Sequence, residues 1–187
     1  MLDDYSRYIL AWTLRSAMQA TDVMETLDLA RAATGVDHMP VAHRPRLLSD
    51  NGPCYISAQL ATYLDAHGLP HTRSAPYHPM TRGKIERYHR SLKNVVKLEH
   101  YYAPWEVERA VAHFVVDYNH RRSHEALQNV TPADIFYGRQ ATILARRARI
   151  KQRTLQRRKR ENLQMPHHAA IRSDVSLRNG AEVSNLV

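Results

Sequence analysis

The stretch that decides the fold is RLLSDNGP, residues 46–53. A short apolar run, Leu47-Leu48, precedes Asp50, and the breaker sequence 51–53 ends any regular element at once. This pattern predicts a short strand with Asp50 at its C-terminal end. An aspartate before Asn-Gly is also typical of a simple turn, so the stretch by itself leaves both interpretations open.

A second stretch, GKIERYHR at residues 83–90, lies inside a helix predicted from about Thr81 to Leu98. Thirty-five residues separate Asp50 from Glu86. Carboxylates placed on a strand end and on a helix are held rigidly enough to bind metal ions. Two Mg²⁺ ions about 3.5–4 Å apart serve in-line displacement at phosphorus. The alternative for Glu86 is a surface ion pair with Arg90, four residues on.

Strands and helices alternate along the chain, which favours an α/β domain. The residues 5–14, YSRYILAWTL, are typical of a strand. The other predicted elements are a helix from the capping pair Asp22–Glu25 to Gly35, a helix capped by Ser57 and stopped by Gly68, a strand at 71–74, a helix at 105–119, and a helix start at Thr131-Pro132.

The net charge of +9 is concentrated near the C-terminus. Ten of the 27 Lys and Arg residues lie in 139–160, which contains no acid, so the other 17 face all 18 acidic residues. The segment predicts either a solvated helix or tail, or a contact with nucleic acid. Residues 165–187 lack a pattern and are predicted to be disordered.

One cysteine, Cys54, excludes a disulfide framework and a Cys-rich zinc finger. No apolar run approaches the length of a membrane span, and residues 1–7 do not read as a signal peptide. We therefore expect a reducing cytoplasm and no membrane partner.

Five motifs, in order over residues 1–140, resemble the DDE transposases of bacterial insertion sequences, whose core is similar to that of retroviral integrases. The motifs are DDYSRYI at 3–9, SDNG at 49–52, HPMTRGKIERYHRSLK at 78–93, YNHRRSHEAL at 118–127 and TPAD at 131–134.

The resemblance implies an RNase H-like α/β fold, a mixed sheet flanked by helices. Asp50 matches the second catalytic carboxylate and Glu86 the third, with Mg²⁺ or Mn²⁺ in a two-metal site. Implied partners are DNA and further copies of the chain, a homo-oligomer on DNA, in a bacterial cytoplasm at the nucleoid. The expected division is a partial integrase core at 1–138, a basic arm at 139–164 and a tail at 165–187.

Glu86, Arg90 and Lys93 fall on one helical face, at i, i+4 and i+7, so a metal ligand and phosphate contacts would point the same way. The family places its basic DNA-contacting residue at Lys93. The alternative is that the basic residues of this helix form a solvated face without DNA contact. The predicted DNA-binding residues are Lys84, Arg87, Arg90, Lys93 and Lys97. His78 falls near the expected site, and residues 118–124 are predicted to form a helix end and turn that close the fold.

The family carries its first catalytic aspartate on a first strand, which would fall before Met1. Asp3 and Asp4 match the second strand instead and are not candidates. The expectation is a core without its first strand. Two hypotheses follow: a working transposase that obtains this segment from elsewhere, or an inactive remnant that only binds DNA or a partner protomer. A different RNase H-like nuclease is a third option, and the helix at 83–90 and the basic arm argue against it.

Overall fold

The computed structural model describes residues 1–74 and 83–164. The chain divides into two compact units, residues 1–140 and 141–187. The predicted site neighbour His78 and the predicted tail lie outside the described residues. No helix in the described ranges is long and apolar enough to cross a membrane.

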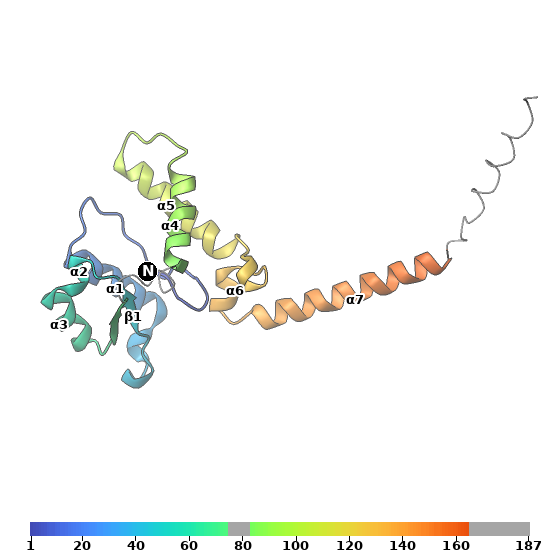
Figure 1. The fold of residues 1–187 in the computed structure, drawn as a ribbon, viewed down its shortest axis with the longest axis horizontal. Coiled ribbons are helices and arrows are strands. Elements are labelled where there is room, and N and C mark those ends of the chain that lie inside the picture. Colours follow the sequence, from blue (N-terminus) through green and yellow to red (C-terminus); the bar gives the residue numbers. More distant parts are fainter. Residues whose placement is uncertain (75–82, 165–187) are drawn as a thin grey trace, which may run out of the picture. The chain divides into compact units, whose positions relative to one another are not determined.

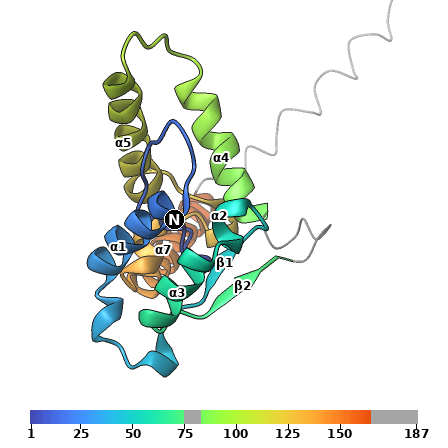
Figure 2. The ribbon, with the colours of Figure 1, turned by 90° about the vertical axis from the view of Figure 1, so that its left-hand side faces the viewer.

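A parallel pair of strands, β1 (Leu47–Ser49) and β2 (His71–Arg73), forms the sheet of the described residues. The chain crosses from one strand to the other through α2 (Pro53–Ile56) and α3 (Ala58–Ala66), and Figure 2 shows α3 beside both strands. Leu48 pairs with Thr72 in the register. Both strands were predicted from the sequence, and both are confirmed within one residue of their ends.

The strand pair and its crossover pack on α1 (Ala20–Thr34). The apolar cluster between them is formed by Val23, Leu27, Val36, Leu60, Leu64 and Leu69. The predicted cap and stop of α3 are confirmed, because the Ser57 hydroxyl accepts a hydrogen bond from the Leu60 amide at 3.2 Å and the helix ends before Gly68. Gly68 has φ +56, and a Cβ there would lie 2.9 Å from Val41. Glycine is therefore required at this turn.

The start predicted for α1 is wrong by three residues. Asp22 does not precede the helix but lies in its first turn, where the carboxylate accepts a hydrogen bond from the Gln19 backbone N–H at 2.8 Å. Glu25 pairs instead with Arg15. An acidic residue in the first turn is equally favourable because it faces the positive end of the helix dipole.

A second cluster lies between α4 (Gly83–Val96) and α5 (Pro104–His120), which run side by side in Figure 1. Its buried members are Ile9, Tyr88, Val111, Phe114, Val115 and Tyr118. After α5 come two short helices, the 3-10 helix η4 (Glu125–Leu127) and then α6 (Pro132–Phe136). Thr131 caps α6 as predicted, accepting from the Asp134 amide at 3.2 Å.

Residues 5–14 do not form the predicted strand. They are tied to the N-terminus at one isolated bridge, Leu2 with Ile9, and the Asp3 amide donates to the Tyr8 carbonyl at 2.8 Å. A strand needs a ladder of backbone partners, and here the turn at 3–7 leaves only isolated pairing. The apolar side chains still enter the core, since Ile9 is 4% exposed.

The second unit contains most of α7 (Gln140–Gln164), a helix of 25 residues with no buried side chain. The basic residues of 139–160 therefore lie on one exposed, continuous helix, except Arg139, which directly precedes it. Of the two forms predicted for this arm, helix or tail, the helix is the one observed.

Candidate active site

Asp50 directly follows β1, and the residues around it are fixed by local hydrogen bonds. Its Oδ1 atom accepts from the Gly52 amide at 2.9 Å, which closes a turn. A Cβ at position 52 would come within 3.0 Å of that oxygen, so glycine permits this close approach. The Asn51 side-chain amide donates to the Ser74 carbonyl at 2.9 Å and so fastens the turn to the end of β2.

The surroundings of Asp50 are partly withdrawn from water. Burial raises the pKa of the neighbouring Tyr55 above its usual value, and the negative charge of Asp50 raises it further. On the strand pair, Ser49 lies 2.8 Å from the His71 Nε2 atom, and burial together with Arg73 lowers the pKa of this histidine. Asp50 is thus a turn residue and a rigidly held carboxylate at once.

Glu86 lies in the first turn of α4 and is exposed. The helix buries one stripe, Ile85, Tyr88, Leu92 and Val96, against α5. Glu86 projects beside this stripe, and no hydrogen bond or ion pair holds its carboxylate among the described residues. The ion pair with Arg90 that would make Glu86 a surface residue of no further role is therefore not formed.

Residues 75–82, which lie between Asp50 and Glu86 in the sequence, are outside the described residues. Within residues 1–74 and 83–164, no three His, Cys, Asp or Glu side chains gather in a way that would hold a metal ion. The donor set that the two carboxylates offer is of the kind that Mg²⁺ accepts, since this ion takes one or two carboxylates and keeps water and phosphate oxygens as its other ligands.

The predicted DNA-binding residues divide between two flanks of α4. Lys84 donates to the Asp4 carboxylate and to the Asp4 carbonyl, each at 2.8 Å, so its ammonium group ties the helix to the N-terminal segment. Arg90, Lys93 and Lys97 are exposed and share the flank of Glu86, as their spacing predicts. Arg87, one residue after Glu86, is turned about 100° further around the axis.

Asp3 and Asp4 have structural partners. The Asp3 carboxylate accepts from the Ser6 amide at 2.7 Å and from the Ser6 hydroxyl at 2.5 Å, and it thereby closes the turn that leads to Ile9. Asp4 binds Lys84. Both carboxylates thus hold the N-terminal turn and its link to α4.

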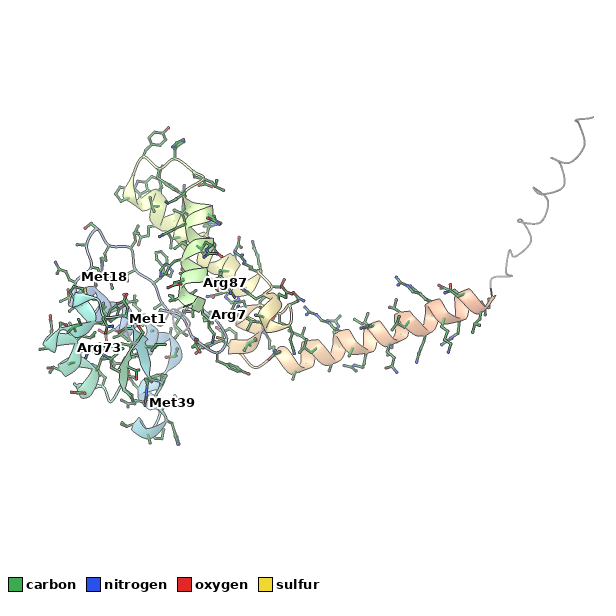
Figure 3. All side chains as sticks on the ribbon, viewed as in Figure 1. Met1, Arg7, Met18, Met39, Arg73 and Arg87 are labelled. Atoms are coloured by element: carbon green, nitrogen blue, oxygen red, sulfur yellow. The ribbon has the colours of Figure 1, made fainter. Side chains whose placement is uncertain are left out.

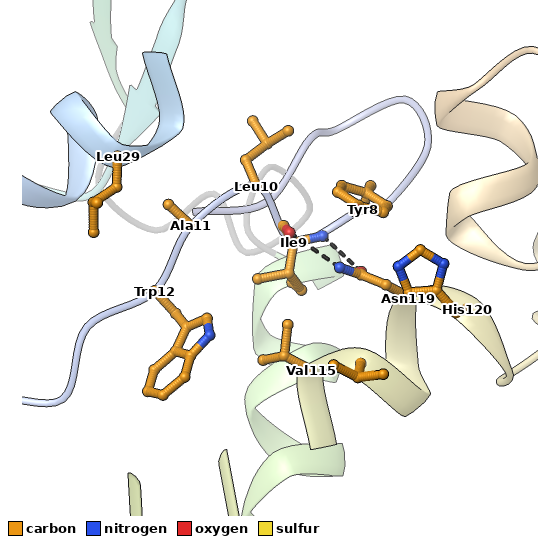
Figure 4. Close-up of a pocket in the computed structure, with 10 residues that line it drawn as sticks. Tyr8, Ile9, Leu10, Ala11, Trp12, Leu29, Val115, Asn119 and His120 are labelled. Carbon is orange, nitrogen blue, oxygen red and sulfur yellow. Dashed lines mark hydrogen bonds between the residues drawn. The ribbon is translucent and has the colours of Figure 1, made fainter. Parts of the chain in front are cut away.

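The residues 118–124 close the fold, as predicted. The Tyr118 ring packs edge-on against Tyr88 at 5.2 Å and against His124 at 4.9 Å. Asn119 is 3% exposed and makes two hydrogen bonds to the backbone of Ile9, one from the Ile9 amide to Oδ1 at 2.9 Å and one from Nδ2 to the Ile9 carbonyl at 3.1 Å. Figure 4 shows this pair. Sequence reasoning missed this link, although a polar Asn in the apolar stripe of a helix is a signal for a buried partner.

A shallow hollow of about 380 Å³ lies along residues 8–12, between α5 and Leu29 of α1 (Figure 4). Its walls are polar and apolar in nearly equal measure, and neither Asp50 nor Glu86 takes part. The hollow is therefore separate from the candidate catalytic carboxylates.

Two protein-family models match parts of the sequence. Residues 1–79 match a family model described as an integrase core domain, and residues 67–132 match a second model with the same description. The Gag-Pol polyprotein of bovine immunodeficiency virus is 34% identical over 91 residues, 48% of this chain. The Gag-Pro-Pol polyprotein of mouse mammary tumor virus is 27% identical over 123 residues, 64% of this chain. The chain spans 6% of the length of each polyprotein.

Solved structures show the same fold. The catalytic core domain of the bovine immunodeficiency virus integrase covers 76% of this chain, which covers 86% of it, with a TM-score of 0.53 at 23% identity. A chain of the simian T-cell lymphotropic virus intasome covers 71% of this chain, which covers 45% of it, with a TM-score of 0.59 at 20% identity. The fold is that of an integrase catalytic core, RNase H-like, as the sequence predicts.

Proposed function

We propose that this chain, whose residues 1–132 carry integrase core domain sequence, takes part in cutting and joining DNA by metal-dependent phosphodiester chemistry. The relatives found include retroviral polyproteins, and we assign the narrower role of an insertion-sequence transposase on the five motifs. The observation that carries the proposal is the placement of two carboxylates: Asp50 is held at the end of β1, and Glu86, at the start of α4, has no hydrogen-bond or ion-pair partner within residues 1–74 and 83–164.

Strand transfer requires an oxygen nucleophile to attack phosphorus in line with the leaving oxygen. Two divalent ions, Mg²⁺ or Mn²⁺, supply activation of the nucleophile and stabilisation of the leaving group when bound. Asp50 suits a fixed ligand, because the Gly52 amide sets the rotation of its carboxylate. Glu86 suits an adjustable ligand, because no contact in the described chain restrains it. DNA would approach along the flank shared by Arg90, Lys93 and Lys97, and the active form would be an oligomer on DNA.

An inactive remnant that binds DNA or a partner protomer is the second candidate function. It is favoured because no three His, Cys, Asp or Glu side chains gather to hold a metal ion within residues 1–74 and 83–164. The two candidates differ in metal binding and in chemistry, and they agree on DNA binding.

The test measures Mn²⁺ binding by electron paramagnetic resonance and joining of labelled duplex ends taken from the DNA that flanks the gene. The variants are Asp50→Asn and Glu86→Gln, with Asp117→Asn as the matched control, since Asp117 pairs with Arg121 on the surface. Mn²⁺ binding and joining that both variants abolish, and the control retains, support the active enzyme. Joining that survives both substitutions would refute the assignment of the two carboxylates.

A further inference from the structure

Three arginines from distant parts of the sequence have no acidic partner in the part of the chain that the structure describes. Arg7 lies in the turn before Ile9, Arg87 in α4, and Arg122 two residues after α5 ends. None forms an ion pair with any carboxylate in residues 1–74 or 83–164, whereas Arg15, Arg31, Arg121 and Arg139 all do. Arg87 and Arg122 are exposed, and Arg7 is half-buried. Figure 3 shows Arg7 and Arg87 in the same region.

Three contacts hold together the segments that carry these three arginines. The Lys84–Asp4 ion pair joins the start of α4 to the N-terminal turn. The double hydrogen bond between Asn119 and Ile9 joins the same turn to the end of α5. The Tyr88–Tyr118 ring contact, 5.2 Å between centroids, joins α4 to α5 directly. Each arginine is within three residues of one of these contacts, so the cluster is positioned by packed and hydrogen-bonded parts of the fold.

The backbone of Arg7 is itself constrained. It adopts φ 63, in the left-handed region, and its amide donates to the Asp3 carbonyl at 2.8 Å. This conformation is unfavourable for a residue other than glycine, and it persists where the surroundings impose it. The turn therefore fixes the direction in which the Arg7 side chain leaves the backbone.

The positive charges of the three arginines act on the same two side chains, Tyr118 and His124. Burial raises the pKa of Tyr118, and the positive charges of Arg7, Arg122 and Arg87 oppose that rise. Burial lowers the pKa of His124 to about 4, and the same three arginines lower it further. The Nε2 atom of His124 is buried, without a hydrogen-bond partner among the described residues. Three unneutralised cations around one locus repel one another, and an anion bound there would remove that repulsion.

We infer that Arg7, Arg87 and Arg122 form a phosphate-binding site that holds the backbone of duplex DNA. The inference rests on the proposed function for the choice of DNA as the source of phosphate. Arginine suits this role because its planar guanidinium group binds phosphate oxygens through two parallel hydrogen bonds and stays charged. The site contacts a different stretch of backbone from the one that faces Glu86, because Arg87 is turned about 100° away from that carboxylate on α4.

The first experiment measures DNA binding by fluorescence anisotropy with a labelled duplex of arbitrary sequence, in EDTA and at several salt concentrations. The test variant replaces Arg7, Arg87 and Arg122 by glutamine. The control variant removes the same charge from three other arginines, Arg15, Arg46 and Arg109. Each phosphate contact contributes about 0.9 to the slope of log K against log salt, so we expect the test variant to lose about 3 from the slope and the control less than 1. Equal losses of slope in both variants would mean that net charge alone, and not this site, governs DNA binding, and would overturn the inference.

A second readout follows the imidazole protons of His124 by NMR, identified by their loss in His124→Gln. DNA should raise the pKa of His124 from about 4 in the parent protein and leave it unchanged in the triple variant. Sodium phosphate, added alone, tests a free anion as the ligand: saturation by phosphate with no effect of the triple substitution on DNA binding would refute the DNA assignment. The single variant Arg122→Gln serves if the triple variant does not fold.

The two proposals fail separately. Asp50→Asn and Glu86→Gln should leave DNA binding in EDTA intact, and the triple variant should lose it. Joining that survives Asp50→Asn and Glu86→Gln, with normal DNA binding, would count against the catalytic proposal alone. Unchanged binding in the triple variant would count against the phosphate site alone.

Discussion

Replacing Asn119 by alanine tests the contact that holds the N-terminal segment on the core. Asn119 is 3% exposed and Ile9 is 4% exposed. The side-chain amide satisfies both backbone polar groups of Ile9, at 2.9 and 3.1 Å. Alanine removes both partners and leaves the Ile9 amide and carbonyl inside the cluster. The two residues are 110 positions apart, so no neighbouring backbone group replaces the lost amide.

The expected cost follows from these two buried groups. A buried donor or acceptor that loses its partner costs about 1–3 kcal/mol, so two cost about 2–6 kcal/mol. The shallow hollow beside residues 8–12 admits water to part of the site, which favours the lower half of that range, about 2–4 kcal/mol. Such a loss is a large fraction of a typical stability of about 5–15 kcal/mol.

Urea unfolding, followed by tryptophan fluorescence, measures the change. Trp12 packs against the cluster that contains Ile9, so its emission reports on this part of the fold. With a slope of about 2 kcal/mol per molar urea, the midpoint should fall by about 1–2 M. Asn119→Leu keeps the branching at Cγ, fills the site with a larger apolar side chain and removes the hydrogen bonds, and Asn94→Ala on the exposed side of α4 serves as the control. A loss below about 1 kcal/mol in both Asn119 variants would refute the reasoning.

Three further predictions concern pH, the arm and a helix cap. Because the pKa of His124 is about 4 in the fold and about 6.5 in an unfolded chain, the stability from the neutral ring is complete above pH 6.5 and declines as pH falls toward 4. The loss, discounted for a half-exposed ring, is about 1–2 kcal/mol in urea titrations, and His124→Gln should flatten it. Thr131→Ala removes a capping hydroxyl and should cost about 1 kcal/mol, a fall in Tm of about 3–5 °C by calorimetry. Replacing one side of α7 by glutamine should lower the salt slope of DNA binding by about 4–5, and an unchanged slope would contradict DNA contact by that side. That side comprises Arg146, Arg149, Arg153, Arg157 and Arg160.

The parts of the fold that the sequence predicts are those whose causes are local. Ser57 and Thr131 cap helices through amides three residues away, so the cap and its helix share one short stretch. The short strand at 47–49 is recognised by the breaker sequence that follows it. The integrase-core fold itself was predicted from motif order, and the solved structures confirm it.

The errors occur where the cause is distant or shared. Residues 5–14 have strand-forming side chains, but the pairing of a strand depends on backbone partners that composition does not reveal. The start of α1 was misplaced because Asp22 can stabilise a helix either before its first residue or within its first turn, and the difference depends on the Gln19 amide.

The candidate site divides in the same way. Asp50 is placed by its own turn, and Glu86 by the periodicity of its helix, so both positions follow from nearby residues. The role of Asn119 depends on Ile9, and the grouping of Arg7 with Arg87 depends on the turn at 3–7. No pattern of spacing in one sequence contains those relations, since they arise only when the N-terminal segment packs on α4 and α5.

The burial of Tyr88 explains how adjacent residues of α4 come to serve different surfaces. Its ring is 6% exposed and packs on Tyr118, which fixes the rotation of the helix about its axis. With that rotation fixed, Glu86 and Arg87 must leave the helix about 100° apart, one toward the flank of Arg90 and the other away from it. The metal-binding proposal and the phosphate-binding inference therefore depend on one packing contact, although they share no ligand. A helix free to rotate by one residue would exchange the two positions and disable both surfaces.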